Sequence, residues 1–131
     1  MLDVRLYQPA DRAACLAFTD DPGFAQFLDG ITCPYFVMEH DGVIVGCGGF
    51  RIADKHATLE WGIIGGAWRK MGLGRFLLMY RLREIGKFPG IEHVSVDVPS
   101  TIAPFFEKQG FKVAHASARG VQLTKRLIVC A

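Results

Sequence analysis

A short glycine-containing segment, residues 69–75, constrains the fold of this chain more than any other part of its sequence. It lies between an apolar, strand-like run (59–64) and an apolar and basic, helix-like run (76–87), so Gly72 and Gly74 fall at a strand-to-helix turn. Glycine lets a backbone approach a ligand closely, and the first N–H groups of a helix point outward with the positive end of the helix dipole. The segment therefore predicts an anion site of a kind that binds phosphate.

The length and composition predict one globular domain, residues 1–131, because half of the residues are hydrophobic and suffice for a single core. The longest apolar runs, such as 43–50, are far shorter than the roughly 20 residues of a membrane helix, and the amino terminus shows no signal pattern. We expect a soluble cytoplasmic protein with no membrane partner. The cysteines lie far from one another and from the histidines, which favours buried free thiols over a metal site. They are Cys15, Cys33, Cys47 and Cys130.

The charges are distributed unevenly along the chain. Residues 1–61 hold four Lys/Arg against nine Asp/Glu, whereas residues 69–87 hold six Lys/Arg against Glu84 alone. A solvated surface would explain either charge run by itself. Because the basic block coincides with the glycine turn, it favours a polyanionic ligand there. Nucleic-acid binding is disfavoured, since these charges interleave with core residues and no base-stacking aromatic set accompanies them.

Apolar periodicity and turn residues predict interleaved strands and helices. Asp41-Gly42 signals a hairpin, and the glycines of 46–49 indicate a bulge. Simple alternation in 58–64 would place Glu60, Gly62 and Ile64 on one face and Leu59, Trp61 and Ile63 on the other. Interleaving of this kind implies an α/β (α+β) fold with a mixed sheet and helices on its faces. The expected strands are 4–7, 35–39, 43–50, 58–64, 93–98, 111–114 and 121–129, and the expected helices are 9–18, 24–28, 76–87 and 100–109, the last capped by Ser100 and closed by Gly110.

Two nucleotide-binding motifs do not fit the glycine turn. A dinucleotide fingerprint would need a third glycine where this chain has Leu77, and a P-loop would need Gly-Lys-Ser/Thr. What remains is Arg69-x-x-Gly72-x-Gly74 between a strand and a helix, followed after the next strand by Phe-Glu-Lys-Gln-Gly-Phe at 106–111.

With these two segments in this order, the chain resembles the GNAT superfamily of acyl-coenzyme A dependent N-acetyltransferases over essentially its whole length. The family signature is Arg/Gln-x-x-Gly-x-Gly/Ala, and its second element is an aromatic residue followed by Glu-Lys-x-Gly-Phe. The resemblance implies a mixed, mostly antiparallel central sheet of six to seven strands with helices on both faces. It also implies acetyl-CoA as co-substrate and no metal.

In this resemblance, backbone N–H groups of 70–75 bind the coenzyme A pyrophosphate, which agrees with small residues where bulk would block approach. The pantetheine arm pairs with the main chain of the strand before the turn. The expected coenzyme-binding residues are Ile63, Ile64, Arg69, Lys70, Met71, Gly72, Leu73, Gly74, Arg75, Ser100 and Phe106.

The resemblance also implies catalytic roles. Glu60, a carboxylate in an apolar strand, is the candidate base that takes the amine proton through water; an acid facing solvent at a strand edge is the alternative. A main-chain N–H of 63–65 would stabilise the thioester oxygen. Family members often have a tyrosine at the aromatic position of the second motif, where it protonates the thiolate, but Phe106 cannot donate. Water or solvent then supplies that proton, or the role is absent.

Two functions therefore remain open: acetylation of a primary amine by direct attack in a ternary complex, or a non-catalytic acyl-CoA-binding regulatory module. The acceptor, a small molecule or a peptide amine, would be chosen by residues 18–35 and 114–120. Asp20, Asp21 and Asp29 favour a cationic acceptor, although they could equally cap helices. The apolar end, residues 127–130, could add to a partner's sheet in a homodimer.

Overall fold

Seven strands form one mixed sheet in the computed structural model, which describes residues 1–127. The strand order is β1-β2-β3-β4-β5-β7-β6, and every neighbouring pair is antiparallel except β4 with β5. The expected mixed, mostly antiparallel sheet is confirmed. The strands are β1 (Leu2–Leu6), β2 (Tyr35–His40), β3 (Val43–Ala53), β4 (His56–Ile64), β5 (His93–Val98), β6 (Lys112–Ser117) and β7 (Gly120–Arg126).

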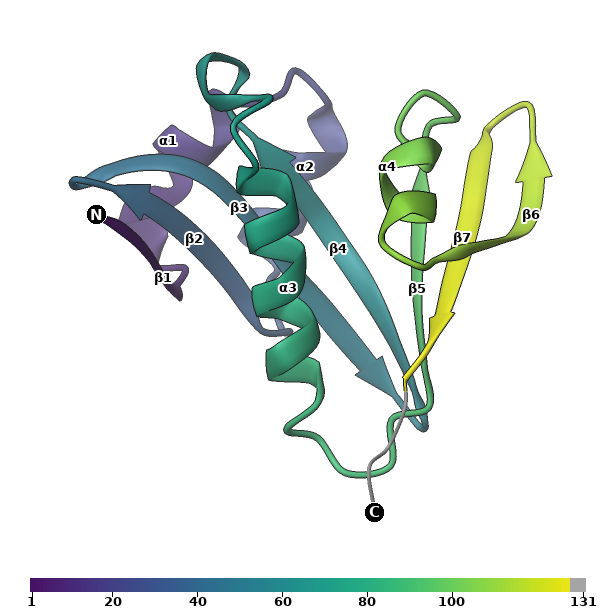
Figure 1. The fold of residues 1–131 in the computed structure, drawn as a ribbon. Helices are drawn as coiled ribbons and strands as arrows, with labels where there is room; N and C mark the ends of the chain where they lie inside the picture. Colours follow the sequence, from purple (N-terminus) through teal and green to yellow (C-terminus); the bar gives the residue numbers. More distant parts are fainter. Residues whose placement is uncertain (128–131) are drawn as a thin grey trace.

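Helices cover both faces of this sheet, as expected (Figure 1). On one face, α1 (Arg12–Leu16) and α2 (Pro22–Asp29) enclose a cluster around Phe24. On the other face lie α3 (Leu73–Ile85) and α4 (Ala103–Lys108), which bury Leu78 and Phe106 in the main cluster. Short 3-10 turns, η1 (Pro9–Asp11) and η2 (Gly66–Trp68), precede α1 and the glycine turn.

Two turns have the backbone that their sequences predict. Asp41 and Gly42 both have positive φ, 51° and 84°, so the β2–β3 hairpin turns where Asp-Gly indicates. Gly110 has φ of 91° and ends α4.

The expected start of α4 was wrong. The helix begins at Ala103, its N-cap residue is Ile102, and no side chain caps it. Residues 99–102 form a tighter turn instead, in which the Ile102 N–H donates to the Pro99 carbonyl at 2.9 Å. Ser100 is exposed in that turn and caps nothing.

Residues 128–131 lie outside the described part of the chain, so the expected strand end at 128–129, Cys130 and most of the proposed dimer edge fall there. Within residues 1–127, none of the helices is both long and apolar enough to cross a membrane.

Candidate active site

A cleft opens where β4 and β5 separate. The two strands pair at only three positions, His56 with His93, Ala57 with Val94 and Thr58 with Ser95, and they diverge beyond them (Figure 1). The cleft has a volume of about 580 Å³. It is lined by Phe18, Thr19, Asp21, Thr58, Leu59, Glu60, Trp61, Gly62, Ile63, Arg69, Arg81, Val96, Asp97, Val98, Pro99, Ile102 and Phe106.

A β-bulge shapes the β4 wall of this cleft. The register between β3 and β4 shifts between Cys47 and Gly49, so Gly48 stands opposite both Trp61 and Gly62. Trp61 has φ of 40°, a left-handed conformation that costs a bulky residue about 1–3 kcal/mol. In this bulge the extra residue belongs to β4, whereas the bulge expected within 43–50 is the register shift against β2 between Met38 and Glu39, which leaves Val45 of β3 as the extra residue.

The bulge overturns the simple alternation expected for 58–64. Leu59 packs with Leu78 on the face covered by α3, whereas Trp61 and Ile63 pack with Phe24 on the opposite face. One extra residue reverses the side-chain parity of everything that follows it in the strand. Leu59 and Trp61 thus lie on opposite faces, not on the same one.

Glu60 lies in the cleft immediately before the bulge. Its side chain is 18% exposed, and Oε1 lies 3.5 Å from Nη1 of Arg51 on the neighbouring strand. Because the Arg51 side chain is 58% exposed, solvent screens this ion pair. The carboxylate is therefore partly buried yet reachable from the cleft, which suits a proton acceptor.

The glycine turn enters α3 with two residues in the left-handed conformation. Gly72 is the N-cap residue with φ of 81°, and Lys70 also has positive φ, 64°. Gly74 lies in the first helical turn, where an added Cβ would meet Phe105 Cζ at an ordinary 3.7 Å. The conformation therefore favours glycine at position 72 but not at position 74.

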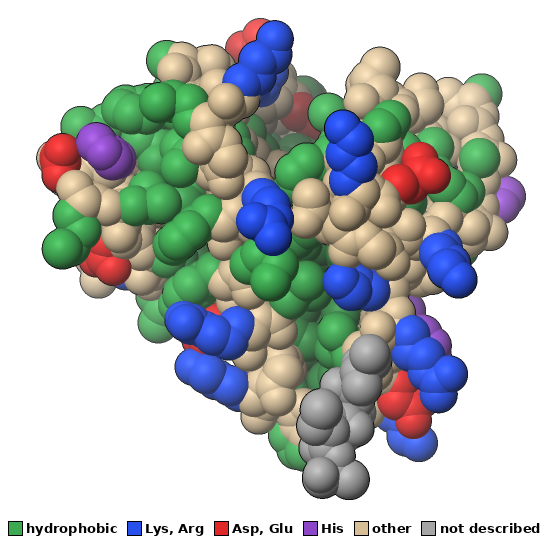
Figure 2. Space-filling model, viewed as in Figure 1, with side chains coloured by type: hydrophobic (Ala, Val, Ile, Leu, Met, Phe, Trp, Pro, Cys, Tyr) green, Lys and Arg blue, Asp and Glu red, His purple; other side chains and the backbone are tan. Residues whose placement is uncertain are grey.

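The three basic side chains of this turn, Arg69, Lys70 and Arg75, are exposed. Figure 2 shows Lys and Arg side chains spread over the face that carries α3, separated by apolar surface. Arg69 also reaches into the cleft, where Nε donates to the Ile64 carbonyl at 3.2 Å. This carbonyl belongs to the strand segment expected to pair with the pantetheine arm.

The other expected coenzyme-binding side chains are divided between the cleft and its surroundings. Ile63 and Phe106 line it, and Phe106 packs edge-on against Phe111 with the ring centroids 5.3 Å apart. Met71 is exposed, Leu73 and Ile64 pack in a small cluster with Leu77, and Ser100 does not line the cleft.

Arg81 is a cleft residue that the sequence analysis missed. It is only 4% exposed, and Nη1 donates to the Gly49 carbonyl at 3.3 Å. Within residues 1–127, Nε has no hydrogen-bond partner and no Asp or Glu forms an ion pair with the guanidinium. Burial lowers the pKa of Arg81 to about 10, so the side chain keeps its charge at neutral pH.

The bulge makes room for this guanidinium. A Cβ added at Gly62 would lie 2.7 Å from Nη2 of Arg81, and one at Gly48 would lie 3.3 Å from its Cζ. The signal in the sequence was the spacing: Arg81 follows Leu77 by four residues and precedes Ile85 by four, so it interrupts the buried face of α3.

Of the three acids expected near the acceptor, one lines the cleft. Asp21 does so while it caps α2, where it accepts the Gly23 N–H at 2.9 Å. Asp29 instead pairs with Arg12 at 2.8 Å, and Asp20 is not among the lining residues.

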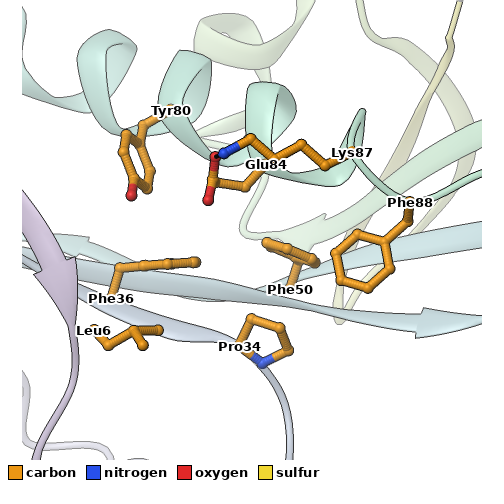
Figure 3. Close-up of a pocket in the computed structure, with 8 residues that line it drawn as sticks. All are labelled: Leu6, Pro34, Phe36, Phe50, Tyr80, Glu84, Lys87 and Phe88. Carbon is orange, nitrogen blue, oxygen red and sulfur yellow. Dashed lines mark ion pairs between the residues drawn. The ribbon is translucent and has the colours of Figure 1, made fainter.

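A second hollow, of about 550 Å³, lies against the carboxyl-terminal half of α3 and holds no residue of either sequence motif (Figure 3). An ion pair between Lys87 Nζ and Glu84 Oε2, 2.6 Å apart, lies at its edge. The hollow is lined by Leu6, Pro34, Phe36, Phe50, Tyr80, Glu84, Lys87 and Phe88.

Within residues 1–127, no group of three or more His, Cys, Asp or Glu side chains lies close enough together to hold a metal ion.

Comparison with known sequences gives one family and one relative. A protein-family model described as "Acetyltransferase (GNAT) domain" matches residues 32–113, more than half of the chain. The uncharacterized protein YyaT of Bacillus subtilis (strain 168) is 30% identical over 82 residues, which cover 63% of this chain and 55% of YyaT. The aligned part thus spans about half the length of that relative.

Three solved structures illustrate the similarity of fold. N-acetylglutamate synthase from Neisseria gonorrhoeae, complexed with coenzyme A and N-acetyl-glutamate, has a TM-score of 0.82 at 15% identity, over 98% of this chain and 36% of that one. The ribosomal-protein-S18-alanine N-acetyltransferase from Escherichia coli has a TM-score of 0.80 at 17% identity, over 100% and 97%. The PaiA N-acetyltransferase from Thermoplasma acidophilum, in complex with coenzyme A, has a TM-score of 0.75 at 15% identity, over 97% and 99%.

Proposed function

Because the chain belongs to the GNAT family of acetyltransferases, we propose that it transfers an acetyl group from acetyl-CoA to a primary amine by direct attack in a ternary complex. The observation that carries this proposal is the cleft between β4 and β5. One open space is lined by Arg69, the first residue of the glycine turn, by Glu60 and by Phe106 of the second motif. Solved neighbours of the same fold bind coenzyme A, which supports a coenzyme A thioester as the donor.

The pyrophosphate is proposed to bind at the turn before α3, through the N–H groups of residues 70–75. Lys70 and Gly72 have positive φ, a conformation that recurs in backbone turns that bind anions, and α3 adds its helix dipole. Arg69, Lys70 and Arg75 supply positive charge around this site. These features fit a diphosphate, which carries negative charge on several oxygens.

The pantetheine arm is proposed to lie along β4 at Ile63 and Ile64. Within the described chain, β5 pairs with β4 only at positions 56–58, so beyond them no strand covers the edge of β4 that faces the cleft, and the Ile64 carbonyl accepts only from the exposed Arg69 side chain. A ligand with amide groups can add to such an edge as an extra strand. Within 63–65, the Gly65 N–H already donates to the Val45 carbonyl of β3 at 2.8 Å, so the donor proposed for the thioester oxygen is the N–H of Ile63 or Ile64.

Glu60 is proposed to remove the proton that the attacking amine must lose. A lysine-like amine has a pKa near 10.4, so little of it is free base at neutral pH. A positioned general base typically contributes about 10²- to 10⁴-fold to turnover. Because Asp21 lies in the same cleft, we propose a cationic acceptor, either a small molecule or a peptide amine.

One observation favours the alternative, a non-catalytic acyl-CoA-binding regulatory module. Phe106, where a tyrosine would supply a proton, is buried in the cleft wall and has no hydroxyl. A module of this kind would bind acetyl-CoA through the same turn and strand without turning it over.

The substitution Glu60→Gln distinguishes the two functions. For an enzyme, we expect turnover to fall about 10²- to 10⁴-fold while the dissociation constant for acetyl-CoA stays the same. The loss should be greatest at low pH, where few amine molecules lose a proton unaided. Turnover is measured as coenzyme A release with a panel of amines, and acetyl-CoA affinity by calorimetry.

The matched control is Glu92→Gln, because the Glu92 side chain is 52% exposed and pairs with Lys55 outside the cleft. Tight acetyl-CoA binding by the wild type without turnover of any amine would establish the module. Failure of the wild type to bind acetyl-CoA would overturn both functions.

A further inference from the structure

A buried cation without a counter-ion lies on the wall of the cleft. The Arg81 guanidinium has one hydrogen bond, to the Gly49 carbonyl, and Nε has no partner among residues 1–127. Removing a charge from water without pairing it is strongly unfavourable. An anionic ligand group in the cleft would therefore pair with the guanidinium, beside which Gly62 and Gly48 leave space.

The position of Arg81 indicates which anion this is. In the proposed complex the pantetheine arm runs from the turn before α3 back along Ile64 and Ile63. The next residue is Gly62, where a Cβ would touch the guanidinium at 2.7 Å. The end of the arm, which carries the sulfur, thus reaches the level of Arg81.

We propose, on the basis of the proposed function, that Arg81 is a catalytic residue that stabilises the coenzyme thiolate as it leaves. The amine nitrogen forms a bond to the thioester carbonyl carbon, and its proton passes through water to Glu60. The carbon–sulfur bond breaks, and its electron pair leaves on sulfur. Arg81 holds that sulfur as an anion until solvent protonates it, so no side-chain acid is needed at Phe106.

The other charged groups around the cleft act with or against Arg81. Glu60, Asp97 and Asp21 line the same space and disfavour a thiolate, whereas Arg69 favours one from the turn. Tyr35 and Cys47 interact with Arg81 but belong to the cluster on the opposite face of the sheet and do not line the cleft. Only Arg81 combines a positive charge with burial among these lining residues, and burial reduces screening of its field.

The test is a titration of the coenzyme A thiol in its complex with the protein, which needs no acceptor. Thiolate is measured by its ultraviolet absorbance against pH, and the complex with S-methyl-coenzyme A, which has no thiol, serves as the reference. The variants are Arg81→Met, Arg81→Lys and the matched control Arg83→Met. Arg83 lies on the same helix with its side chain 68% exposed.

In the wild type, and with Arg83→Met, we expect at least ~10-fold more thiolate below the thiol pKa than with Arg81→Met, since a cation within about 4–6 Å has this effect. Arg81→Met should also melt at the same temperature as the wild type or higher, because it removes an unpaired buried charge. A merely structural arginine would give a lower melting temperature and an unchanged thiol titration.

Equal thiolate fractions in wild type and Arg81→Met, with coenzyme A bound to both, would overturn the proposal. If Arg81→Met does not fold, the test uses Arg81→Lys, which keeps a positive charge and should keep the raised thiolate fraction of bound coenzyme A. If the thiol bound to Arg81→Lys titrates as it does in free coenzyme A, the proposal is refuted. Succinyl-CoA bound at least ~10-fold more tightly than acetyl-CoA by the wild type alone would assign Arg81 to an acyl carboxylate instead. Absence of coenzyme A binding by the wild type would remove the proposed function itself.

Discussion

Substitution of the two glycines of the turn before α3 should have opposite effects on stability. Gly72 has φ of 81°, and a residue with a Cβ in the left-handed region costs roughly 1–2 kcal/mol. Alanine also lowers the conformational entropy of the unfolded chain, which stabilises the folded state by about 0.4–1 kcal/mol. The net effect of Gly72→Ala should therefore lie between neutral and a destabilisation of about 1.6 kcal/mol. Gly74 has a helical backbone and space for a methyl group, so Gly74→Ala should stabilise the protein by ~0.5–1 kcal/mol.

The two variants should also differ in coenzyme affinity. Alanine at 72 relieves its strain by changing φ, which turns the N–H groups of 70–75 away from the pyrophosphate. We therefore expect the dissociation constant for coenzyme A to rise at least ~10-fold. Alanine at 74 leaves those groups in place and should bind coenzyme A as the wild type does. Thermal unfolding by circular dichroism should place Gly74→Ala ~3–8 °C above Gly72→Ala, and calorimetry measures the binding.

Two results would refute this reasoning. If Gly72→Ala binds coenzyme A as tightly as the wild type, the orientation of the turn is not what holds the pyrophosphate. If Gly74→Ala loses as much affinity as Gly72→Ala, then the size of the residue matters at both positions and the backbone conformation at 72 does not explain the motif.

Two further predictions concern stability. Gly49→Ala should destabilise the protein by about 3 kcal/mol in denaturant unfolding, because its Cβ would lie 2.3 Å from the Pro34 carbonyl oxygen; an unchanged midpoint would contradict this. Asp11 accepts both Arg5 Nη groups, at 2.8 and 2.9 Å, and these bonds hold the pKa of Asp11 below its usual value. The ionised Asp11 therefore stabilises the fold fully above about pH 3.9, and this contribution is lost as the pH falls below that value. Asp11→Asn should lower the free energy of unfolding by ~1–3 kcal/mol at pH 7, and the difference from the wild type should disappear in acid.

The parts of the fold that depend on local conformation could be predicted from the sequence. Asp41-Gly42, Gly72 and Gly110 all adopt positive φ, which few residues other than glycine, asparagine and aspartate tolerate. Such residues mark the hairpin, the glycine turn before α3 and the end of α4 irrespective of what surrounds them.

The parts of the fold that depend on pairing between distant segments could not be predicted from the sequence. The extra residue of the bulge at Trp61 exists only relative to the register of β3, and nothing within 58–64 alone indicates it. Arg81 was counted only as one charge of the basic block at 69–87, because the face of α3 that is buried depends on which strands it covers. Ser100 has a good capping side chain, but Pro104 in the first turn and the bend at Pro99 place the helix start three residues later.

Because β4 and β5 pair at only three positions, part of the edge of β4 has no neighbouring strand, although β4 is a central strand of the sheet. Edges of this kind accept any extended chain with amide groups at the right spacing. If the pantetheine arm binds this edge as proposed, it does so through the main chain, and a short linear peptide should compete for the edge without imitating a nucleotide. Peptides are then rational starting points for ligands that displace coenzyme A.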